Sequence, residues 1–185
     1  PKLLPKNATV GYPHDQDQNM DIACRKIFGP CAMMPFKNQE GILSAVSQGM
    51  CRYGIVPLEG NTKRVYDLLA QHGLYIVRCF RLQGQNLYIC ISKTLEIYPG
   101  ADRSSIRMAL SDRPGALYKI FARLYTLGIN VLGLESRPVA DTDFQKMFYF
   151  DLETSVYSEE FVQLMCELDD LCENFSYLGS YSEVV

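Results

Sequence analysis

Residues 104–138 read SSIRMALSDRPGALYKIFARLYTLGINVLGLESRP, and this stretch decides the fold of the second half of the chain. A strand-like run over Ser104–Leu110 leads through a polar turn into apolar residues at helical spacing. Pro114 suits a first helical turn, so we expect a helix over Pro114–Leu127. A second apolar run predicts a strand over Ile129–Arg137. The stretch therefore predicts a strand–helix–strand unit.

The same alternation continues to the end of the chain. We expect a strand over Phe144–Leu152, a helix over Ser158–Cys172 and a strand over Phe175–Tyr181. Ser158 is a suitable N-cap, and the two glutamates that follow it favour the positive end of the helix dipole. Residues 104–181 thus read βαββαβ, the ferredoxin-like order, with both helices covering one side of a four-stranded sheet.

The first half alternates strand-like and helix-like segments, which indicates an α/β layer. The short runs that suit strands are Val10–Tyr12, Cys31–Pro35, Tyr53–Pro57 and Leu74–Leu82. The apolar pattern stops at the turn-forming cluster Tyr98–Asp102 and restarts with a new period. We therefore predict an α/β protein with a three-layer α/β domain over residues 1–98 and a ferredoxin-like domain over residues 99–185.

Composition excludes several classes of function. The net charge of −3 and the absence of a Lys/Arg stripe argue against nucleic acid as a partner. No apolar run reaches the ~18 residues of a membrane span, and Pro1–Val10 lacks a signal-peptide core, so we expect a cytoplasmic protein. Seven cysteines without a C-x-x-C pair and two distant histidines predict reduced core thiols, no metal site and no cofactor.

Three motifs in the second half carry a family resemblance: Asp112–Leu117, Ile129–Val131 and Glu135–Pro138. Together they resemble the ACT domains of prephenate dehydratases and aromatic amino-acid hydroxylases, over about residues 101–185. The resemblance implies L-phenylalanine as the effector, bound at a site shared between two chains of a homodimer or tetramer. The residues that it places at the effector site are Asp112, Pro114, Gly115, Ala116, Leu117, Asn130, Glu135, Ser136 and Arg137.

Elementary chemistry is consistent with an amino-acid ligand at these motifs. Gly115 lacks a Cβ, so a ligand carboxylate can approach the backbone N–H groups at the start of a helix. Glu135 and Ser136 can accept hydrogen bonds from an ammonium group. Structural roles stay open: Gly115 can relieve crowding, Asn130 can order the turn after Gly128, and Arg137 can form a structural ion pair.

The first half resembles the opening subdomain of the prephenate dehydratase catalytic domain. Tyr53–Glu59 and the following Val65–Leu69 are similar to that family's Pro-Ile-Glu-Asn-Ser segment and its next helix. The departures are a turn with Asp15 and Asp17 in place of a neutral glycine- and serine-rich one, and no second subdomain. In addition, Asn86–Tyr88 stands where the family has its catalytic Thr-Arg-Phe.

Two functions follow from this resemblance. The first is a phenylalanine-binding regulatory module of L-phenylalanine biosynthesis with a degenerate dehydratase domain. The second is an active prephenate dehydratase whose site a partner chain completes, with His14, Glu59 and Thr62 as the catalytic candidates. A ligand-free interaction module is a third possibility. Residues 1–7 read as a linker that can follow a chorismate mutase domain, as the family architecture implies.

Overall fold

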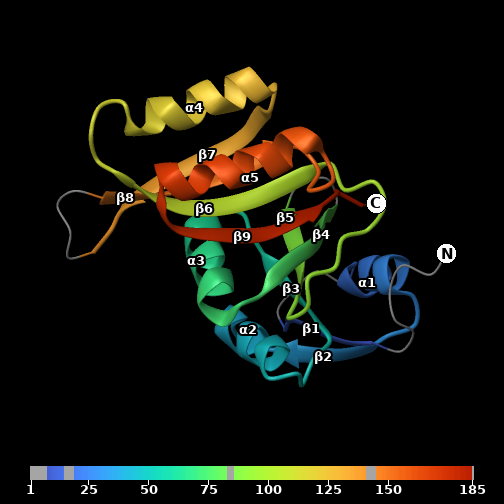
Figure 1. Cartoon of the computed structure of the whole chain (residues 1–185). Helices are drawn as coiled ribbons and strands as arrows, with labels where there is room; N and C mark the ends of the chain where they lie inside the picture. Colours follow the sequence, from blue (N-terminus) through green and yellow to red (C-terminus); the bar gives the residue numbers. More distant parts are fainter. Residues whose placement is uncertain (1–7, 15–18, 83–85, 141–144, 185) are drawn as a thin grey trace. The chain divides into compact units, whose positions relative to one another are not determined.

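A computed structural model describes residues 8–14, 19–82, 86–140 and 145–184 of the chain. The chain forms two compact units. Unit 1 comprises Pro1–Gly100 together with Tyr181–Val185, and unit 2 comprises Ala101–Ser180. This division differs from the expected linear one because the last residues return to unit 1. The predicted mixed α/β fold class, with one sheet in each unit, is confirmed (Figure 1).

Unit 2 has the predicted ferredoxin-like topology. Its sheet has the strand order β7-β8-β6-β9, in which β8 runs antiparallel to both β6 and β7. Its elements in chain order are β6 (Arg103–Ser111), α4 (Ala116–Leu127), β7 (Asn130–Pro138), β8 (Gln145–Glu153), α5 (Glu159–Leu171) and β9 (Glu173–Tyr181).

Both helices of unit 2 cover the same face of its sheet (Figure 1). The apolar stripes predicted on the two helices form the core there, with Ile120 and Leu124 from α4 and Leu164 from α5 almost fully buried. They pack against the inward-facing positions of β6 and β8, among them Met108 and Phe150. Ser158 caps α5 as expected, since its side chain accepts a hydrogen bond from Phe161 N at 3.1 Å.

The start of helix α4 was predicted wrongly. The helix begins at Ala116 rather than Pro114, because Gly115 has a φ of +100° and cannot continue a right-handed helix. Pro114 therefore belongs to the turn that leads from β6 to the helix. The expected first residue of the strand β8, Phe144, lies outside the described residues.

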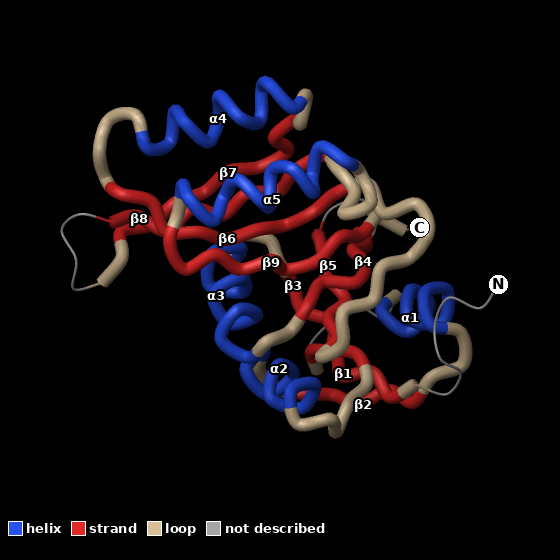
Figure 2. The backbone as a smooth tube through the Cα atoms, viewed as in Figure 1, coloured by secondary structure: helices blue, strands red, loops and turns tan. Residues whose placement is uncertain are grey.

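Unit 1 is built on a five-stranded sheet with the order β2-β1-β3-β5-β4. The strand β1 runs parallel to β2 and β3, whereas β5 runs antiparallel to β3 and β4. Figure 2 shows the strands in red and the helices in blue. Its elements are β1 (Thr9–Pro13), α1 (Met20–Phe28), β2 (Ala32–Phe36), α2 (Gln39–Ser47), β3 (Tyr53–Pro57), α3 (Thr62–His72), β4 (Tyr75–Leu82) and β5 (Asn86–Ser92).

The side chains of β3 show the three layers of unit 1. Tyr53 and Ile55 point into the core cluster that contains the buried residues of α1. Gly54 faces the opposite side, where a Cβ would lie 2.7 Å from Ile42 Cγ2 and 2.9 Å from Val46 Cγ2 of α2. Glycine at this position therefore lets α2 approach the sheet closely.

The parallel strands determine where unit 1 can build a site. Because β1, β2 and β3 run in the same direction, their carboxyl ends meet at one edge of the sheet. Helices α2 and α3 begin at that edge, directly after β2 and β3. In open α/β sheets, ligands bind at this carboxyl edge.

Candidate functional site

The turn before α4 carries the main motif of unit 2. It contains Asp112, Arg113, Pro114 and Gly115, and the left-handed Gly115 sends the chain into the helix. Asp112 lies outside the helix and pairs with Lys146 at 3.4 Å. The first N–H groups of any helix have no intrahelical partner and carry a partial positive charge, so this end of α4 attracts anions.

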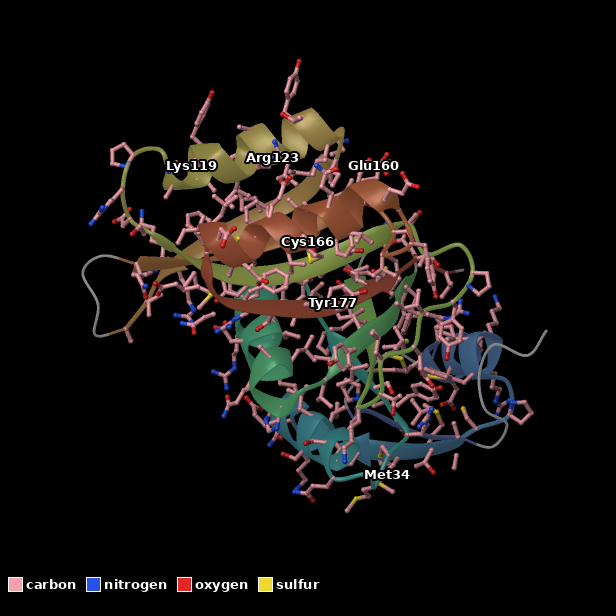
Figure 3. All side chains as sticks on the ribbon, in the orientation of Figure 1. Met34, Lys119, Arg123, Glu160, Cys166 and Tyr177 are labelled. Atoms are coloured by element: carbon pink, nitrogen blue, oxygen red, sulfur yellow. The ribbon has the colours of Figure 1, made fainter. Side chains whose placement is uncertain are left out.

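A cavity of about 510 Å³ adjoins this turn. One side is formed by the start of α4 with Arg113 and Lys119, and the other side is formed by the end of α5 and the start of β9, with Asp169, Asp170 and Glu173. Figure 3 shows Lys119 on α4, one turn after the helix start. The cavity therefore has two cations and a helix N-terminus at one side, and three acids and a helix C-terminus at the other.

Only three of the nine predicted effector residues line this cavity, namely Pro114, Gly115 and Ala116. Asn130 donates a hydrogen bond to Glu153 Oε2 at 3.1 Å. Arg137 Nε donates to Tyr149 Oη at 2.7 Å, which gives this arginine a structural partner. Pro114, Gly115 and Ala116 thus form part of a cavity within one chain, whereas Leu117 and the residues of β7 do not line it.

Strand alternation also separates the two predicted ammonium acceptors. Ser136 is in register with Phe148, which faces the helices, whereas Glu135 is in register with Tyr149 on the opposite face. A single ammonium group that approaches one face of β7 therefore meets only one of them. Sequence proximity alone suggested that both could act together.

The three predicted catalytic residues of unit 1 all lie at the carboxyl edge of its sheet. His14 follows β1 and its backbone N–H donates to Phe36 O at 2.8 Å. Glu59 is exposed in the turn after β3. Thr62 is the first residue of α3, and its hydroxyl donates to Leu58 O at 3.3 Å. The fold brings the three to one edge, but none of them lines the cavity found there.

That cavity has a volume of about 410 Å³, and its lining was not predicted from the sequence. Its polar lining residues are Lys37, Asn38, Gln39, Glu40, Asn61 and Arg64. They follow the ends of β2 and β3, and charged residues after parallel strands are the signal that could have found them.

Most of these groups already have partners within the chain. The Arg64 guanidinium pairs with Glu40, and this hydrogen bond lowers the pKa of the Glu40 carboxyl. Asn61 Nδ2 donates to Gln39 Oε1 at 3.0 Å, and Asn38 Oδ1 caps α2 by accepting from Gly41 N at 2.9 Å. The cavity is therefore polar and weakly cationic, and its hydrogen-bonding groups are largely used to hold the two helix starts.

The strand β5 carries the positions that match the family's catalytic motif. Leu87 O accepts a hydrogen bond from Leu58 N at 2.9 Å, so Asn86–Tyr88 runs beside the end of β3. Tyr88 is buried and stacks on Phe80 with ring centroids 5.4 Å apart. These positions offer neither the hydroxyl of a threonine nor the cation of an arginine. Asp15 and Asp17, which stand in place of the family's neutral turn, lie outside the described residues.

Metal and thiol chemistry find little support within the described ranges. No group of three or more His, Cys, Asp or Glu side chains there is arranged to hold a metal ion. Burial raises the pKa of Cys24 to about 12 and that of Cys172 to about 11, so both thiols stay protonated at neutral pH. Across the same ranges, no helix is long and apolar enough to cross a membrane.

The chain is a mixed α/β protein with two units. One is an α/β unit with a cavity at the carboxyl edge of its sheet, and the other is a ferredoxin-like unit with a cavity at the start of α4. A family profile described as prephenate dehydratase matches residues 18–114, about half of the chain. The chain belongs to the prephenate dehydratase family, which confirms the resemblance noted in the sequence of its first half.

Individual relatives agree with this assignment. The bifunctional chorismate mutase/prephenate dehydratase of Aquifex aeolicus is 35% identical over 86 residues, which are 46% of this chain and 24% of that protein. The match thus spans about a quarter of that relative's length.

Solved structures share the fold. A protein described as a novel type of quorum quenching acylase, GqqA, superposes with a TM-score of 0.80 and 23% identity, covering 94% of both chains. The prephenate dehydratase of Arthrobacter aurescens in complex with L-Phe superposes with a TM-score of 0.74 and 16% identity, covering 94% of this chain and 90% of that one. At these identities the likeness concerns the fold alone.

Proposed function

We propose that unit 2 is an ACT domain that binds L-phenylalanine as an effector, and that unit 1 is a degenerate dehydratase domain that does not convert prephenate on its own. The chain would then act in the cytoplasm as a regulatory module of L-phenylalanine biosynthesis. The observation that carries this proposal is the cavity at Gly115, whose two sides have opposite charge.

A zwitterionic amino acid fits this distribution of charge. Its carboxylate would meet the N–H groups at the start of α4, beside Arg113 and Lys119. Its ammonium group would meet Asp169 or Glu173 at the other side. Ala109 and Leu171 supply apolar lining for a side chain. The L-Phe complex of the Arthrobacter aurescens protein, which shares the fold, supports phenylalanine as the amino acid.

The proposal that unit 1 is inactive rests on the chemistry of dehydration. The reaction needs a group that protonates the leaving hydroxyl, together with donors that hold two substrate carboxylates. Asn86 and Leu87 supply neither a hydroxyl nor a cation, and Thr62 uses its hydroxyl at the start of α3. The second candidate function is an active dehydratase completed by a partner chain. Family membership and the cations Lys37 and Arg64 at the edge cavity favour it.

Association through unit 2 belongs to the same proposal. The strand β7 is at the edge of its sheet, and it exposes 49% of Leu132 and 38% of Leu134. On α4, Tyr118 and Tyr125 are seven positions apart and are exposed by 73% and 89%. An exposed edge strand with apolar side chains favours pairing with another strand, so a dimer or tetramer through unit 2 is expected.

Calorimetric titration with a panel of ligands tests the binding proposal. We expect heat of binding with L-phenylalanine, and none with 3-phenylpropionate or phenethylamine, each of which lacks one charged group. Lys119→Gln and Asp169→Asn should each weaken binding of phenylalanine by about 1.5–3 kcal/mol, the range for hydrogen bonds to charged groups. Glu160→Gln, on α5 and outside the cavity lining, is the matched control. Binding that is unchanged in both cavity variants would place the ligand elsewhere.

A further inference from the structure

The two edges of the sheet in unit 1 are protected in different ways. At one edge, Ala32 N of β2 donates to Ala8 O at 3.0 Å. Phe36 O of the same strand accepts from His14 N at 2.8 Å. Backbone groups alternate in direction along a strand, so those of Pro35 face away from β1. Proline has no N–H and cannot complete a ladder there, so β2 is a poor partner for a further strand.

The opposite edge strand, β4, contains no proline and is eight residues long. Residues Ser182–Val184, which we call the returning segment, pair with its outer side. Cys79 N donates to Ser182 O at 3.2 Å, and Val184 N donates to Cys79 O at 2.8 Å. These two bonds flank the bridge between Cys79 and Glu183 and have the pattern of a parallel ladder. The edge of β4 therefore accepts a strand, and a segment of the same chain occupies it.

Side chains add selectivity to this backbone pairing. Arg81 Nε of β4 pairs with Glu183 Oε1 at 3.0 Å, and Val184 packs against the core cluster of unit 1. The ion pair is exposed by 44% at Arg81 and 40% at Glu183, so it contributes more to the choice of partner than to affinity. Because β4 also carries Arg78, pairing of β4 with a second β4 strand would bring like charges together. The edge thus favours an extended segment with an acid followed by an aliphatic residue.

The returning segment can detach without breaking either sheet. It follows Tyr181, the last residue of β9. The preceding Ser180 is fully buried, and its Oγ lies 2.6 Å from Ser104 Oγ. The contacts with unit 1 described above are two backbone hydrogen bonds, one ion pair and one partly buried valine. A contact of this size opens far more readily than the strands of the sheet do. When the segment of one copy leaves β4, the same segment of a second copy offers identical contacts.

We propose that the outer edge of β4 is a strand-acceptor site for the returning segment of a second copy, so that two copies exchange these segments reciprocally. This inference goes beyond the proposed function and does not depend on a ligand in unit 2. Exchange closes a symmetric pair in which each β4 edge is covered again. The segment of the same chain competes, because its short connection gives it an effective concentration of about a millimolar. Exchange is therefore populated at comparable protein concentrations or when the intrachain contact is weakened.

Two charge-reversed variants of the full chain test the exchange, because each loses the ion pair within one chain and together they restore it between chains. Glu183→Arg keeps Arg81 on β4 but repels its own segment. Arg81→Glu keeps a native segment that its own β4 repels. In isotope-labelled Glu183→Arg, the amide NMR signals of Cys79 and Arg81 should leave their native positions. Addition of unlabelled Arg81→Glu at about 1 mM should return them by more than half, since the native segment is already bound at that effective concentration.

Unlabelled Glu183→Arg is the matched control, since it differs from the native chain only in the charge of its segment. Association through unit 2 affects both additions equally. The double variant Arg81→Glu/Glu183→Arg restores the pair within one chain, and its Cys79 signal should be native-like without any addition.

A return of the signals with Arg81→Glu and not with the control supports the exchange. An equal response to both additions, or a response to neither, overturns it. If the reversal at Glu183 disturbs the fold, Val184→Pro, which removes the N–H that donates to Cys79 O, serves as the labelled chain, and the same outcomes decide. These measurements contain no phenylalanine, so their result is separate from that of the calorimetric test.

Discussion

The carboxyl edge of unit 1 and the start of α4 in unit 2 are built from the same parts, namely a strand end, a turn and a helix N-terminus. In unit 2 these parts open onto a cavity with cations at one side and acids at the other. In unit 1 the predicted catalytic residues lie at the edge but outside its cavity, and the lining groups bind one another. Within the lining of the unit 2 cavity, Gln145 Nε2 donates to Glu173 Oε2 at 2.6 Å, so the proposed ligand site depends on the other charged groups there, namely Arg113, Lys119, Asp169 and Asp170.

The largest expected effect concerns turnover in unit 1. We expect the chain to form phenylpyruvate from prephenate far below about 1 per second, the lower end of ordinary enzyme rates. The reason is the loss of the threonine and arginine positions at Asn86–Leu87. An assay that monitors phenylpyruvate checks this. If turnover exceeds this rate and the Glu59→Gln substitution abolishes it, unit 1 is catalytically active. That result would favour the second candidate function, an active dehydratase.

The second prediction concerns the role of Gly115 in the binding of phenylalanine. Phenylalanine at 100 times its Kd should stabilise the chain by about 2.7 kcal/mol, seen as a rise of several degrees in Tm. Gly115→Ala should remove this rise, because a side chain at this φ strains the turn that presents the helix N–H groups. Gly128→Ala at the other end of α4 carries a similar strain, with a φ of +70°, and lies outside the cavity lining. It should lower the Tm of the free protein but keep the ligand-induced rise.

In unit 1, Gly54 is needed for close packing between a strand and a helix rather than for a turn. Gly54→Ala should destabilise unit 1 by about 1–3 kcal/mol, the usual cost of overpacking, because the new Cβ would crowd Ile42 and Val46. Denaturant unfolding measures this. Gly133→Ala in β7 is the control, since the atoms nearest to its Cβ all belong to the Asp151 side chain, the nearest being Oδ2 at 3.2 Å. A larger loss in Gly133→Ala than in Gly54→Ala would contradict the packing argument.

Association should depend on unit 2 and not on unit 1. Leu134→Asp places a charge on the exposed edge strand β7 and should shift the protein toward monomer by at least about tenfold in Kd. Leu95→Asp, at a position of similar exposure in unit 1 (40% against 38%), should leave the assembly unchanged. Sedimentation at tens of micromolar, with and without phenylalanine, measures the oligomeric state of both variants. A native chain that is monomeric under both conditions would rule out the proposed dimer.

The smallest effect is a loss of stability at alkaline pH that is confined to unit 1. Burial raises the pKa of Tyr53 and of Tyr98, whose hydroxyl groups both bind Glu96. The folded state therefore holds these protons more tightly than the unfolded state. The resulting stability is complete below the ordinary tyrosine pKa near 10 and is lost as the pH rises above it.

Denaturant unfolding between about pH 8 and 11 measures this loss, on either side of the ordinary tyrosine pKa. Tyr53→Phe should flatten the dependence, whereas Tyr125→Phe on the exposed side of α4 should not change it. An equal flattening in both variants would show that burial is not the cause.

The sequence by itself determined the elements of both units and the core of unit 2. The apolar period of α4 and α5 is a local property, and the ferredoxin-like order followed from counting the segments. The segment Gly115–Leu117 was singled out by its resemblance to ACT domains, and the left-handed conformation that Gly115 adopts is one that glycine permits at no steric cost. Two details predicted from the sequence were wrong. Helix α4 begins two residues later than expected, and Glu135 and Ser136 point to opposite faces of the sheet.

Tertiary structure decided everything that depends on distant segments meeting. The acids of the cavity beside Gly115 come from Asp169–Glu173, more than fifty positions along the chain, and no local pattern connects them. The same holds for the edge cavity, where Gln39 meets Asn61, and for the return of Ser182–Val184 to Cys79. Such contacts are set by the order and register of strands, which a single sequence constrains only through burial, and polar surface residues carry little of that signal.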